Sequence, residues 1–320
     1  MTHSGAVLLP IIDKLALAPL IENGQYLMAL NRLRQELVRV RGEGVSRGPS
    51  LKAWRNFCAD NFHSHELADN LLINLLSIGP FGQVASRTKS REIHHPEMLD
   101  AIYGLDPNPK ADTAALPALR DWELELGFCL SLRSRCKTLA YELSEVGTAV
   151  RYPRILAVGC GHLREAAAAL SRRGMDGGEF VAYDPHPAAV SFIEHEYDHQ
   201  GLRILSGAWP NVLKNELDGS KFDLIYLPTL LDELDDKAVS ELLIALLAML
   251  EPGGRLLAAN FAPDLQDAAY LEAWLDWWPF YRGEEELAAI VSRIAGSNLR
   301  GQAVFREDSG GSVFVNLEAL

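Results

Sequence analysis

Two glycines and an acid form the pattern in this sequence with the most evident chemistry. Gly159 and Gly161 flank Cys160 directly after a β-branched and apolar run, and Asp184 follows 23 residues after Gly161. Glycine lets a backbone turn approach a ligand closely. A carboxylate at the end of the following strand can accept hydrogen bonds from both hydroxyls of a ribose. The spacing therefore predicts a site for a ligand that contains a nucleoside.

The residues after the glycines narrow the choice of nucleoside. The dinucleotide fingerprint has a third glycine, which packs helix against strand, at the position of Arg164 in this sequence. The arginine would hold helix and strand apart, which disfavours NAD and FAD. The Gly-Lys-Ser/Thr ending of a phosphate-binding loop is also missing from the sequence, so ATP bound in that way is excluded.

Arg164 points to a ligand for a second reason. We expect it in the first turn of a helix, where the helix dipole disfavours a cation. A ligand carboxylate, such as the methionine tail of S-adenosylmethionine, would offset this cost. Alternatively, Arg164 is solvated and pairs with Glu165 or Asp184. His162 has the same two interpretations, because it either lines the ligand or caps the turn.

Strands that alternate with helices would position these residues. An alanine-rich helix is expected from the glycines to Arg173, and further helices at 187–198 and 237–250. Strands are expected at 154–158, 180–183, 203–205, 222–227 and 255–261, and a closing pair at 302–305 and 312–317 around a Gly-Gly turn. This alternation predicts an α/β fold with a parallel, doubly wound sheet. The ligand would lie at the carboxyl ends of the strands.

The first 150 residues are expected to be helical. Leucines fall near helical spacing from Leu17 to Leu37, and short helices are expected at 51–61 and 65–76. The segment 79–97 is polar and contains glycine and proline, which predicts a loop, and so does 103–117. A single long helix is expected at 119–146. The change in character near Pro153 predicts a boundary between domains 1–150 and 151–320.

Composition limits the partners of the chain. The formal net charge is −13, which argues against nucleic acid and anionic membranes, because both need a basic surface. The four cysteines lack the spacing of a zinc site, so no metal is expected, and they are interpreted as reduced thiols in the cytoplasm. The longest apolar run, 242–250, is too short to span a bilayer. A small-molecule substrate fits these limits, and the choice between monomer and homodimer stays open.

Several segments together resemble the successive motifs of class I S-adenosylmethionine-dependent methyltransferases. They also resemble the bacterial family that includes the 3-hydroxy fatty acid methyl ester (quorum signal) synthases, mainly over residues 150–318. The segments are Arg154–Glu165, Phe180–Pro185, Phe222–Tyr226, Leu250–Leu256, Ala259–Phe261 and Asp276–Arg282. The resemblance implies a Rossmann-like sheet of seven strands with a last antiparallel hairpin, S-adenosylmethionine as cofactor, and an N-terminal helical domain that acts as a lid and binds substrate.

The family motifs carry over to individual positions of this chain. Asp184 would hold the ribose with Pro185 beside it, Ala208 and Trp209 would flank the adenine, and Leu227, Pro228 and Thr229 would face the sulfonium. Gly159, Cys160, Gly161, His162 and Arg164 would line the cofactor. The sequence departs from the family at Ala157, where an acid is usual, at Leu163, where the last motif glycine is usual, and over Ser86–His95, which replaces a segment that would face the acceptor.

The sulfonium of this cofactor activates more than one carbon. Attack on the methyl group gives methyl transfer to an oxygen or carboxylate acceptor. Attack on the γ-carbon releases methylthioadenosine, with azetidine-2-carboxylate formation or aminocarboxypropyl transfer. A non-catalytic cofactor-binding protein is a third alternative. A carboxylate nucleophile needs no general base, whereas an alcohol usually does. Asp232 is the candidate base in the loop after the fourth strand, and capping of the next helix is its alternative role.

Aromatic residues near the end of the chain supply further candidates. Trp274, Trp277, Trp278, Phe280 and Tyr281 lie close together in sequence, and aromatic faces attract cations. Tyr281 is a candidate catalytic residue, and Trp277 and Trp278 are candidates for substrate binding. Core packing is the alternative for the whole cluster. In the helical half, Tyr103 is a catalytic candidate and His95 and Arg133 are substrate-binding candidates, each with a structural role as the alternative.

Overall fold

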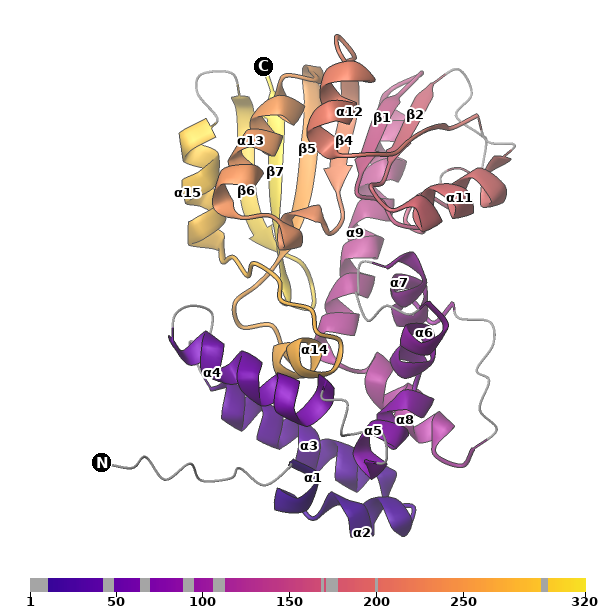
Figure 1. Cartoon of the computed structure of the whole chain (residues 1–320). Coiled ribbons are helices and arrows are strands. Elements are labelled where there is room, and N and C mark those ends of the chain that lie inside the picture. The colour runs from indigo at the N-terminus through magenta and orange to yellow at the C-terminus, as the bar shows by residue number, and fades with distance from the viewer. Residues whose placement is uncertain are drawn as a thin grey trace. The chain divides into compact units, whose positions relative to one another are not determined.

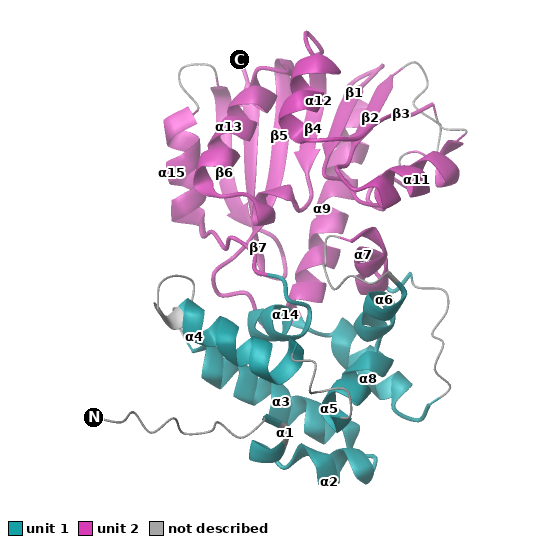
Figure 2. Cartoon of the chain, in the orientation of Figure 1, with its two compact units in different colours: residues 1–92, 104–126, 267–277 teal, residues 93–103, 127–266, 278–320 magenta. Residues whose placement is uncertain are grey.

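The computed structural model describes residues 11–42, 49–63, 70–88, 95–105, 113–167, 170, 178–198, 201–294 and 299–320. Contacts group the chain into two compact units (Figure 2). The helical unit comprises residues 1–92, 104–126 and 267–277, and the sheet unit comprises 93–103, 127–266 and 278–320. This division differs from the expected boundary at residue 150, because the chain passes between the units several times.

The sheet unit contains the predicted parallel sheet with its closing hairpin (Figure 1). Seven strands lie in the order β3-β2-β1-β4-β5-β7-β6. The strands are β1 (Arg154–Val158), β2 (Glu179–Tyr183), β3 (Arg203–Leu205), β4 (Phe222–Leu227), β5 (Leu250–Phe261), β6 (Leu299–Arg306) and β7 (Ser312–Ala319). β7 runs antiparallel to both β5 and β6, and the other pairs are parallel. The chain reverses its direction of travel across the sheet between β1 and β4, and such switch points are where ligands bind.

Alternating side chains of the central strands pack into two hydrophobic cores, one on each face of the sheet. Leu156 and Val158 of β1 belong to one core, and Ile155 and Ala157 belong to the other, as the two-residue period of a strand requires. The helices of the sheet unit are α7 (Pro96–Ile102), α9 (Gly127–Ala149), α11 (Pro187–Glu196), α12 (Trp209–Asn215), α13 (Asp236–Leu247) and α15 (Glu284–Ile294). Side chains of α12, α13 and α15 pack in the first core, and those of α9 and α11 pack in the second.

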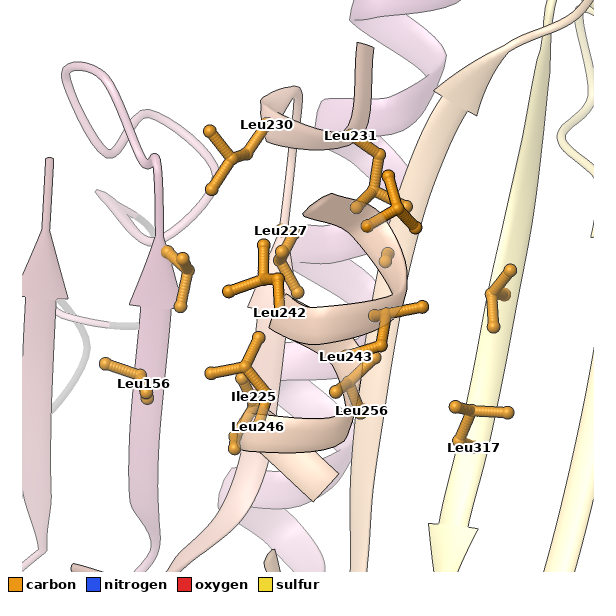
Figure 3. Packing of buried hydrophobic residues seen from close by; sticks show 14 of the residues in the cluster. Leu156, Ile225, Leu227, Leu230, Leu231, Leu242, Leu243, Leu246, Leu256 and Leu317 are labelled. Atoms are coloured by element: carbon orange, nitrogen blue, oxygen red, sulfur yellow. The ribbon is translucent and has the colours of Figure 1, made fainter. Parts of the chain in front are cut away.

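Helix α13 shows how sequence pattern becomes packing. Leu242, Leu243 and Leu246 fall on one helical face and are fully buried against β4 and β5 (Figure 3). Burying one such leucine stabilises a fold by about 1.5–3 kcal/mol. The helix begins where the Asp235 carboxylate accepts a hydrogen bond from the backbone N–H of Ala238 at 2.9 Å.

Two predicted boundaries in the sheet unit are corrected by the structure. Helix α13 ends at Leu247 rather than Leu250, and β5 already begins at Leu250. The Pro252–Gly254 turn lies inside β5, where the register with β4 shifts, because Gly253 adopts a φ of 77° that interrupts regular pairing. Residues 168–169 and 171–173 of the expected alanine-rich helix lie outside the described residues.

The helical unit joins segments from distant parts of the chain. Its helices are α1 (Ile11–Lys14), α2 (Leu17–Glu22), α3 (Tyr26–Arg41), α4 (Pro49–Cys58), α5 (Leu71–Ile78), α6 (Pro80–Thr88), α8 (Leu116–Leu124) and α14 (Ala268–Trp274), with a π-helical turn, η1 (Ala59–His63), after α4. Arg34 on α3 makes a two-point ion pair with Asp267, and Arg41 makes another with Glu272 on α14. These pairs fix a segment that follows β5 in sequence to the N-terminal helices.

Two predictions for the first half of the chain are wrong. The segment 79–97 contains α6 and the start of α7, because proline suits the first turn of a helix and Phe81 and Val84 are fully buried. The expected long helix at 119–146 is two helices, α8 and α9. Helix α9 starts at Gly127, where a Cβ atom would lie 2.4 Å from the Cβ of Gln266. None of the described helices is both long and apolar enough to cross a membrane.

Candidate functional site

The loop after β1 adopts a conformation that favours glycine. Gly159 has a φ of 66° and Gly161 a φ of 55°. A Cβ on Gly159 would lie 3.2 Å from the Cβ of Leu230, and one on Gly161 would lie 3.2 Å from Cδ1 of Leu99. Leu163 also has a positive φ, 55°, at the position where the resembling family has its last motif glycine. That conformation costs a leucine about 1–2 kcal/mol, and its complete burial offsets the cost.

Asp184 connects the end of β2 to this glycine loop. Its Oδ2 accepts a hydrogen bond from the backbone N–H of Gly161 at 2.7 Å, and its Oδ1 accepts one from the N–H of His186 at 2.8 Å. Each carboxylate oxygen can accept a further hydrogen bond. The side chain is buried and held in one orientation. Binding of the two hydroxyls of a ribose stays the prediction for this carboxylate.

Arg164 pairs with a residue that neither sequence interpretation named. Its Nε and Nη2 donate to Oδ1 and Oδ2 of Asp100 on α7, at 2.7 and 2.6 Å, and Nδ1 of His162 lies 2.7 Å from Oδ2. Burial alone would raise the pKa of Asp100, but the hydrogen bonds from Arg164 and His162 lower it below its ordinary value. The ring of Phe192 stacks on His162 and contacts the Arg164 guanidinium. Arg164 therefore joins α7 to the loop.

The other expected cofactor residues are divided between surface and core. Pro185 and Ala208 are exposed and Trp209 is half-buried at the start of α12, all at the carboxyl edge of the sheet. Leu227 is fully buried, and its side chain packs in the core (Figure 3). The alternation of β4 turns this side chain away from the loop, and the prediction that Leu227 faces the sulfonium stays a prediction.

A small cavity lies at the carboxyl ends of β1 and β4. It collects six of the expected cofactor residues and one expected catalytic residue, Tyr103. The lining residues are Leu99, Asp100, Tyr103, Gly159, Cys160, His162, Arg164, Glu165, Pro228 and Thr229. These residues come from the loop after β1, the loop after β4 and helix α7, so the three elements meet at the cavity. Burial raises the pKa of the Tyr103 phenol well above its ordinary value, with Cys136 and Glu165 adding to the effect.

Glu165 is a lining residue that sequence reasoning did not select. It is buried, and the hydroxyl of Tyr226 on β4 donates a hydrogen bond to its Oε1 at 2.8 Å. Burial raises the pKa of Glu165 to about 7, although the hydrogen bonds from its own backbone and from Tyr226 lower it. An acid directly after Arg164 was visible in the sequence, but nothing there showed that it would be enclosed beside a tyrosine of β4.

Asp232 has a structural role in the loop after β4. It is fully buried in the 3-10 helix η4 (Leu230–Glu233) after β4. Its carboxylate accepts hydrogen bonds from Nη1 of Arg135 at 2.6 Å, from the backbone N–H of Phe261 at 2.6 Å and from Nδ2 of Asn260 at 3.1 Å. These contacts indicate a structural role, and the catalytic role of Asp232 stays a prediction. Its alternative, the helix cap, is wrong, since Asp235 caps α13.

Two buried arginines hold the loop that contains Asp232. Nη1 of Arg135 donates to the carbonyl oxygen of Pro228 at 3.0 Å, and its guanidinium lies 4.0 Å from the centroid of the Phe261 ring. Arg282 donates to the carbonyl oxygens of Leu231 and Leu234 at 2.9 and 2.6 Å. Pro228 and Thr229 are thereby fixed at the cavity. Arg133, two residues before Arg135, is the arginine predicted from the sequence, and neither Arg135 nor Arg282 was predicted.

The structure gives His95 and Arg133 positions at the two ends of α7. Nδ1 of His95 accepts a hydrogen bond from the backbone N–H of Glu97 at 3.3 Å, and Nη1 of Arg133 donates to the carbonyl oxygen of Ile102 at 3.0 Å. Neither is among the described residues that line the cavity. Both contacts favour the structural alternative.

The aromatic cluster is divided between the two units. Trp274 and Trp277 are buried in the helical unit, whereas Trp278, Phe280 and Tyr281 belong to the sheet unit. Trp278 and Tyr281 are half-buried and Phe280 is exposed. Packing therefore accounts for Trp274 and Trp277. Among the described residues, no three histidine, cysteine, aspartate or glutamate side chains are grouped to hold a metal ion.

Comparison with known proteins agrees with this fold. A structure of a possible exported protein from Bordetella parapertussis has 17% identity and a TM-score of 0.60, and covers 84% of this chain and 94% of that chain. An O-methyltransferase family protein from Burkholderia thailandensis has 17% identity and a TM-score of 0.44, over 57% of this chain and 55% of that chain. A magnesium protoporphyrin IX methyltransferase from Synechocystis PCC 6803, with bound S-adenosylmethionine, has 11% identity and a TM-score of 0.43, over 60% and 83%. At such identities these structures show likeness of fold alone.

The sequence itself identifies the family. A search of the curated proteins found no match. The family model for the methyltransferase domain matches residues 127–300, more than half of the chain, and its match begins at the first residue of α9. The glycine loop, Asp184 and the cavity at the carboxyl ends of the strands fit the cofactor of that family. The chain therefore belongs to the methyltransferase domain family, within the class I enzymes that use S-adenosylmethionine as cofactor.

Proposed function

We propose that the protein transfers a methyl group from S-adenosylmethionine to an oxygen of a small molecule, with a carboxylate as the preferred acceptor. The observation that carries this proposal is the enclosure of Asp232 by three donors. An acceptor that is already ionised at neutral pH needs no general base. An alcohol would need one, and the candidate base after β4 is engaged with Arg135.

Two other titratable groups at the cavity, Tyr103 and His162, support the same choice. The phenol of Tyr103 keeps its proton near neutral pH because burial raises its pKa. His162 is engaged with Asp100 through Nδ1 and stacked on Phe192. The resemblance to the fatty acid methyl ester synthases also supports a carboxylic acid acceptor. The replaced segment at 86–95, of which 89–94 lie outside the described residues, argues that the acid differs from theirs.

The residues that would hold the cofactor follow from their positions. Asp184 would bind the ribose, Ala208 and Trp209 would flank the adenine, and Pro228 and Thr229 would lie beside the sulfonium. When bound, the cofactor supplies an electrophilic methyl group. A carboxylate oxygen then forms a bond to the methyl carbon as the carbon–sulfur bond breaks, which gives a methyl ester and S-adenosylhomocysteine. Holding the two reactants in line supplies much of the acceleration.

Methyl-labelled cofactor tests this proposal. The protein is incubated with S-adenosylmethionine, labelled in the methyl group, and the small-molecule fraction of a cell extract. We expect S-adenosylhomocysteine together with a labelled product that releases labelled methanol in mild base, as methyl esters do. Asp184→Ala is the control with weakened cofactor binding.

Each other outcome identifies an alternative. A base-stable labelled product would replace the carboxylate with an alcohol or amine acceptor. Methylthioadenosine, formed with cofactor alone, would mean attack at the γ-carbon. Cofactor binding without any product over many extracts would favour a non-catalytic binding protein.

A further inference from the structure

Glu165 is a buried acid at the cavity whose partner carries no charge. Two carboxylates line this cavity, Asp100 and Glu165. The charge of Asp100 is balanced by Arg164 at 2.6 Å, with His162 also in contact. Glu165 instead accepts a hydrogen bond from the hydroxyl of Tyr226, which is a neutral donor. Buried charges in proteins are usually paired, because desolvation of a lone carboxylate is costly. Glu165 is therefore suited to a cationic ligand group.

The location of Glu165 indicates which cation this is. β1 lies between β2 and β4 in the sheet. Asp184 directly follows β2. Glu165 is held by Tyr226 of β4, which lies on the other side of β1. Neighbouring strands are about 4.8 Å apart, so the ends of β2 and β4 are separated by about 10 Å. A cofactor with its ribose at Asp184 and its sulfonium at Pro228 and Thr229 would extend its amino acid arm into this cavity.

Arg164 already has a carboxylate partner within the protein. Its Nε and Nη2 both donate to Asp100. The amino acid arm carries a carboxylate and an ammonium group, and the cavity offers Glu165 to the ammonium. A hydrogen bond between a charged donor and a carboxylate is about twice as strong as one between neutral groups.

We propose that the carboxylate of Glu165, positioned by the Tyr226 hydroxyl, binds the α-ammonium group of S-adenosylmethionine. Glu165 is then a cofactor-binding residue and Tyr226 a positioning residue. The proposal rests on the cofactor and does not depend on the acceptor.

Three ligands that differ in the amino acid arm test this contact by calorimetry. S-adenosylhomocysteine carries the ammonium, its desamino analogue keeps the carboxylate but lacks the ammonium, and methylthioadenosine lacks both. We expect Glu165→Gln to weaken binding of S-adenosylhomocysteine by ten- to hundredfold and binding of the other two by less than threefold. Glu179→Gln, at the opposite end of the sheet in a half-exposed pair with Arg154, is the matched control and should leave all three affinities unchanged.

The remaining outcomes decide against the proposal or separate its parts. Equal losses for all three ligands would mean that Glu165 only supports the loop, and unchanged affinities would overturn the contact. Unchanged affinity with a large fall in turnover would make Glu165 a general base instead. Tyr226→Phe provides a second variant if Glu165→Gln does not fold, and it should weaken only the ammonium-bearing ligand, by three- to tenfold. Failure of the wild-type protein to bind S-adenosylhomocysteine would overturn the cofactor as well, whereas failure to find a methyl ester would leave this test intact.

Discussion

The guanidinium of Arg164 and the carboxylate of Asp100 form a two-point ion pair, with Nε 2.7 Å from Oδ1 and Nη2 2.6 Å from Oδ2. The two residues are 64 positions apart in the sequence. The pair joins α7 to the loop that carries Gly159 and Gly161, both within the sheet unit. Arg164, which the sequence offered as a partner for a ligand carboxylate, is therefore part of the structure that shapes the cavity.

A double-mutant cycle on this pair tests its structural role. We expect Arg164→Met and Asp100→Asn each to lower the free energy of unfolding by about 1–3 kcal/mol, as hydrogen bonds to charged groups do. Asp100→Asn should lower the free energy of unfolding more than Arg164→Met does, because it also loses the contact with His162. The double variant should be little worse than Asp100→Asn alone, since the two residues act together. Urea denaturation gives these values. A tenfold loss of S-adenosylhomocysteine affinity in Arg164→Met alone would restore the ligand carboxylate as its partner.

The pair of Arg135 and Asp232 predicts a large loss of stability without loss of chemistry. Asp232→Asn leaves the buried charge of Arg135 without its counterion, which typically costs about 3–5 kcal/mol. Turnover per folded molecule should fall less than about tenfold, whereas loss of a general base costs about 10²- to 10⁴-fold. Denaturant unfolding and kcat with the identified acceptor measure the two effects. Unchanged stability with a hundredfold fall in kcat would make Asp232 the base after all.

Asp184 has two functions that different ligands can separate. It holds the loop through Gly161 and is expected to bind the ribose. Asp184→Asn should weaken S-adenosylhomocysteine by about 1–3 kcal/mol, the scale of hydrogen bonds to a buried charge. The affinity for a 2′,3′-dideoxy analogue, already weak, should change much less. Equal losses for both ligands would limit Asp184 to fixing the loop.

Much of the sheet was predictable because its strands are short, buried apolar runs that end in glycine or an acid. β3 and β4 occupy the predicted residues, and β1 ends at Val158, directly before Gly159, as expected. The helical half was less predictable, since glycine and proline were interpreted as loop signals. Pro80 instead begins a helix, and Gly127 separates two helices where Gln266 leaves no room for a side chain. The close approach of Gln266 to Gly127 brings together residues more than a hundred positions apart in the sequence.

The site was predictable where a function rests on the backbone and less so where it rests on pairing of side chains. Gly159, Gly161 and Asp184 meet because consecutive parallel strands end at one edge. Helical or strand periodicity cannot tell that Arg164 meets Asp100, or that Asp232 meets Arg135, because charged side chains choose among several partners in space. The same limit concealed Glu165, whose enclosure depends on Tyr226.

Binding of S-adenosylhomocysteine should depend on pH through Glu165. The pKa of Glu165 is raised to about 7, so the group is largely protonated below that pH. Only the ionised form attracts an ammonium, and affinity should therefore rise with pH up to about 7 and then level off, with proton release on binding below it.

Four of the groups near Glu165 titrate above this window. Burial raises the pKa of Cys136 to about 12 and raises those of Tyr103, Cys160 and Tyr226 well above their ordinary values. Asp100 keeps a lowered pKa. Calorimetry from pH 5.5 to 8.5 measures the profile, and Glu165→Gln should be flat. A profile that persists in this variant would assign the titration to another group.

Glu123 should make the stability of the helical unit depend on pH. It is fully buried, and it accepts hydrogen bonds from the Tyr270 hydroxyl at 2.8 Å and from the Phe81 N–H at 3.3 Å. Burial raises its pKa from 4.5 to about 8, against the lowering effect of these bonds. The folded state thus binds more protons than the unfolded state between these values. Its contribution to stability is complete below pH 4.5 and is lost as pH rises to about 8.

Glu123→Gln replaces the acid with a group that stays neutral, so it should flatten this part of the pH profile. Linkage sets an upper limit of about 4 kcal/mol for the difference between pH 5 and pH 8.5. Tryptophan fluorescence during urea denaturation is a suitable readout, because Trp54, Trp122, Trp274 and Trp277 all belong to the helical unit. Glu125→Gln, which changes an exposed acid of the same segment, is the matched control and should keep the wild-type profile. Identical profiles for the wild type and Glu123→Gln would show that Glu123 is ionised in the folded protein, against the effect of its burial.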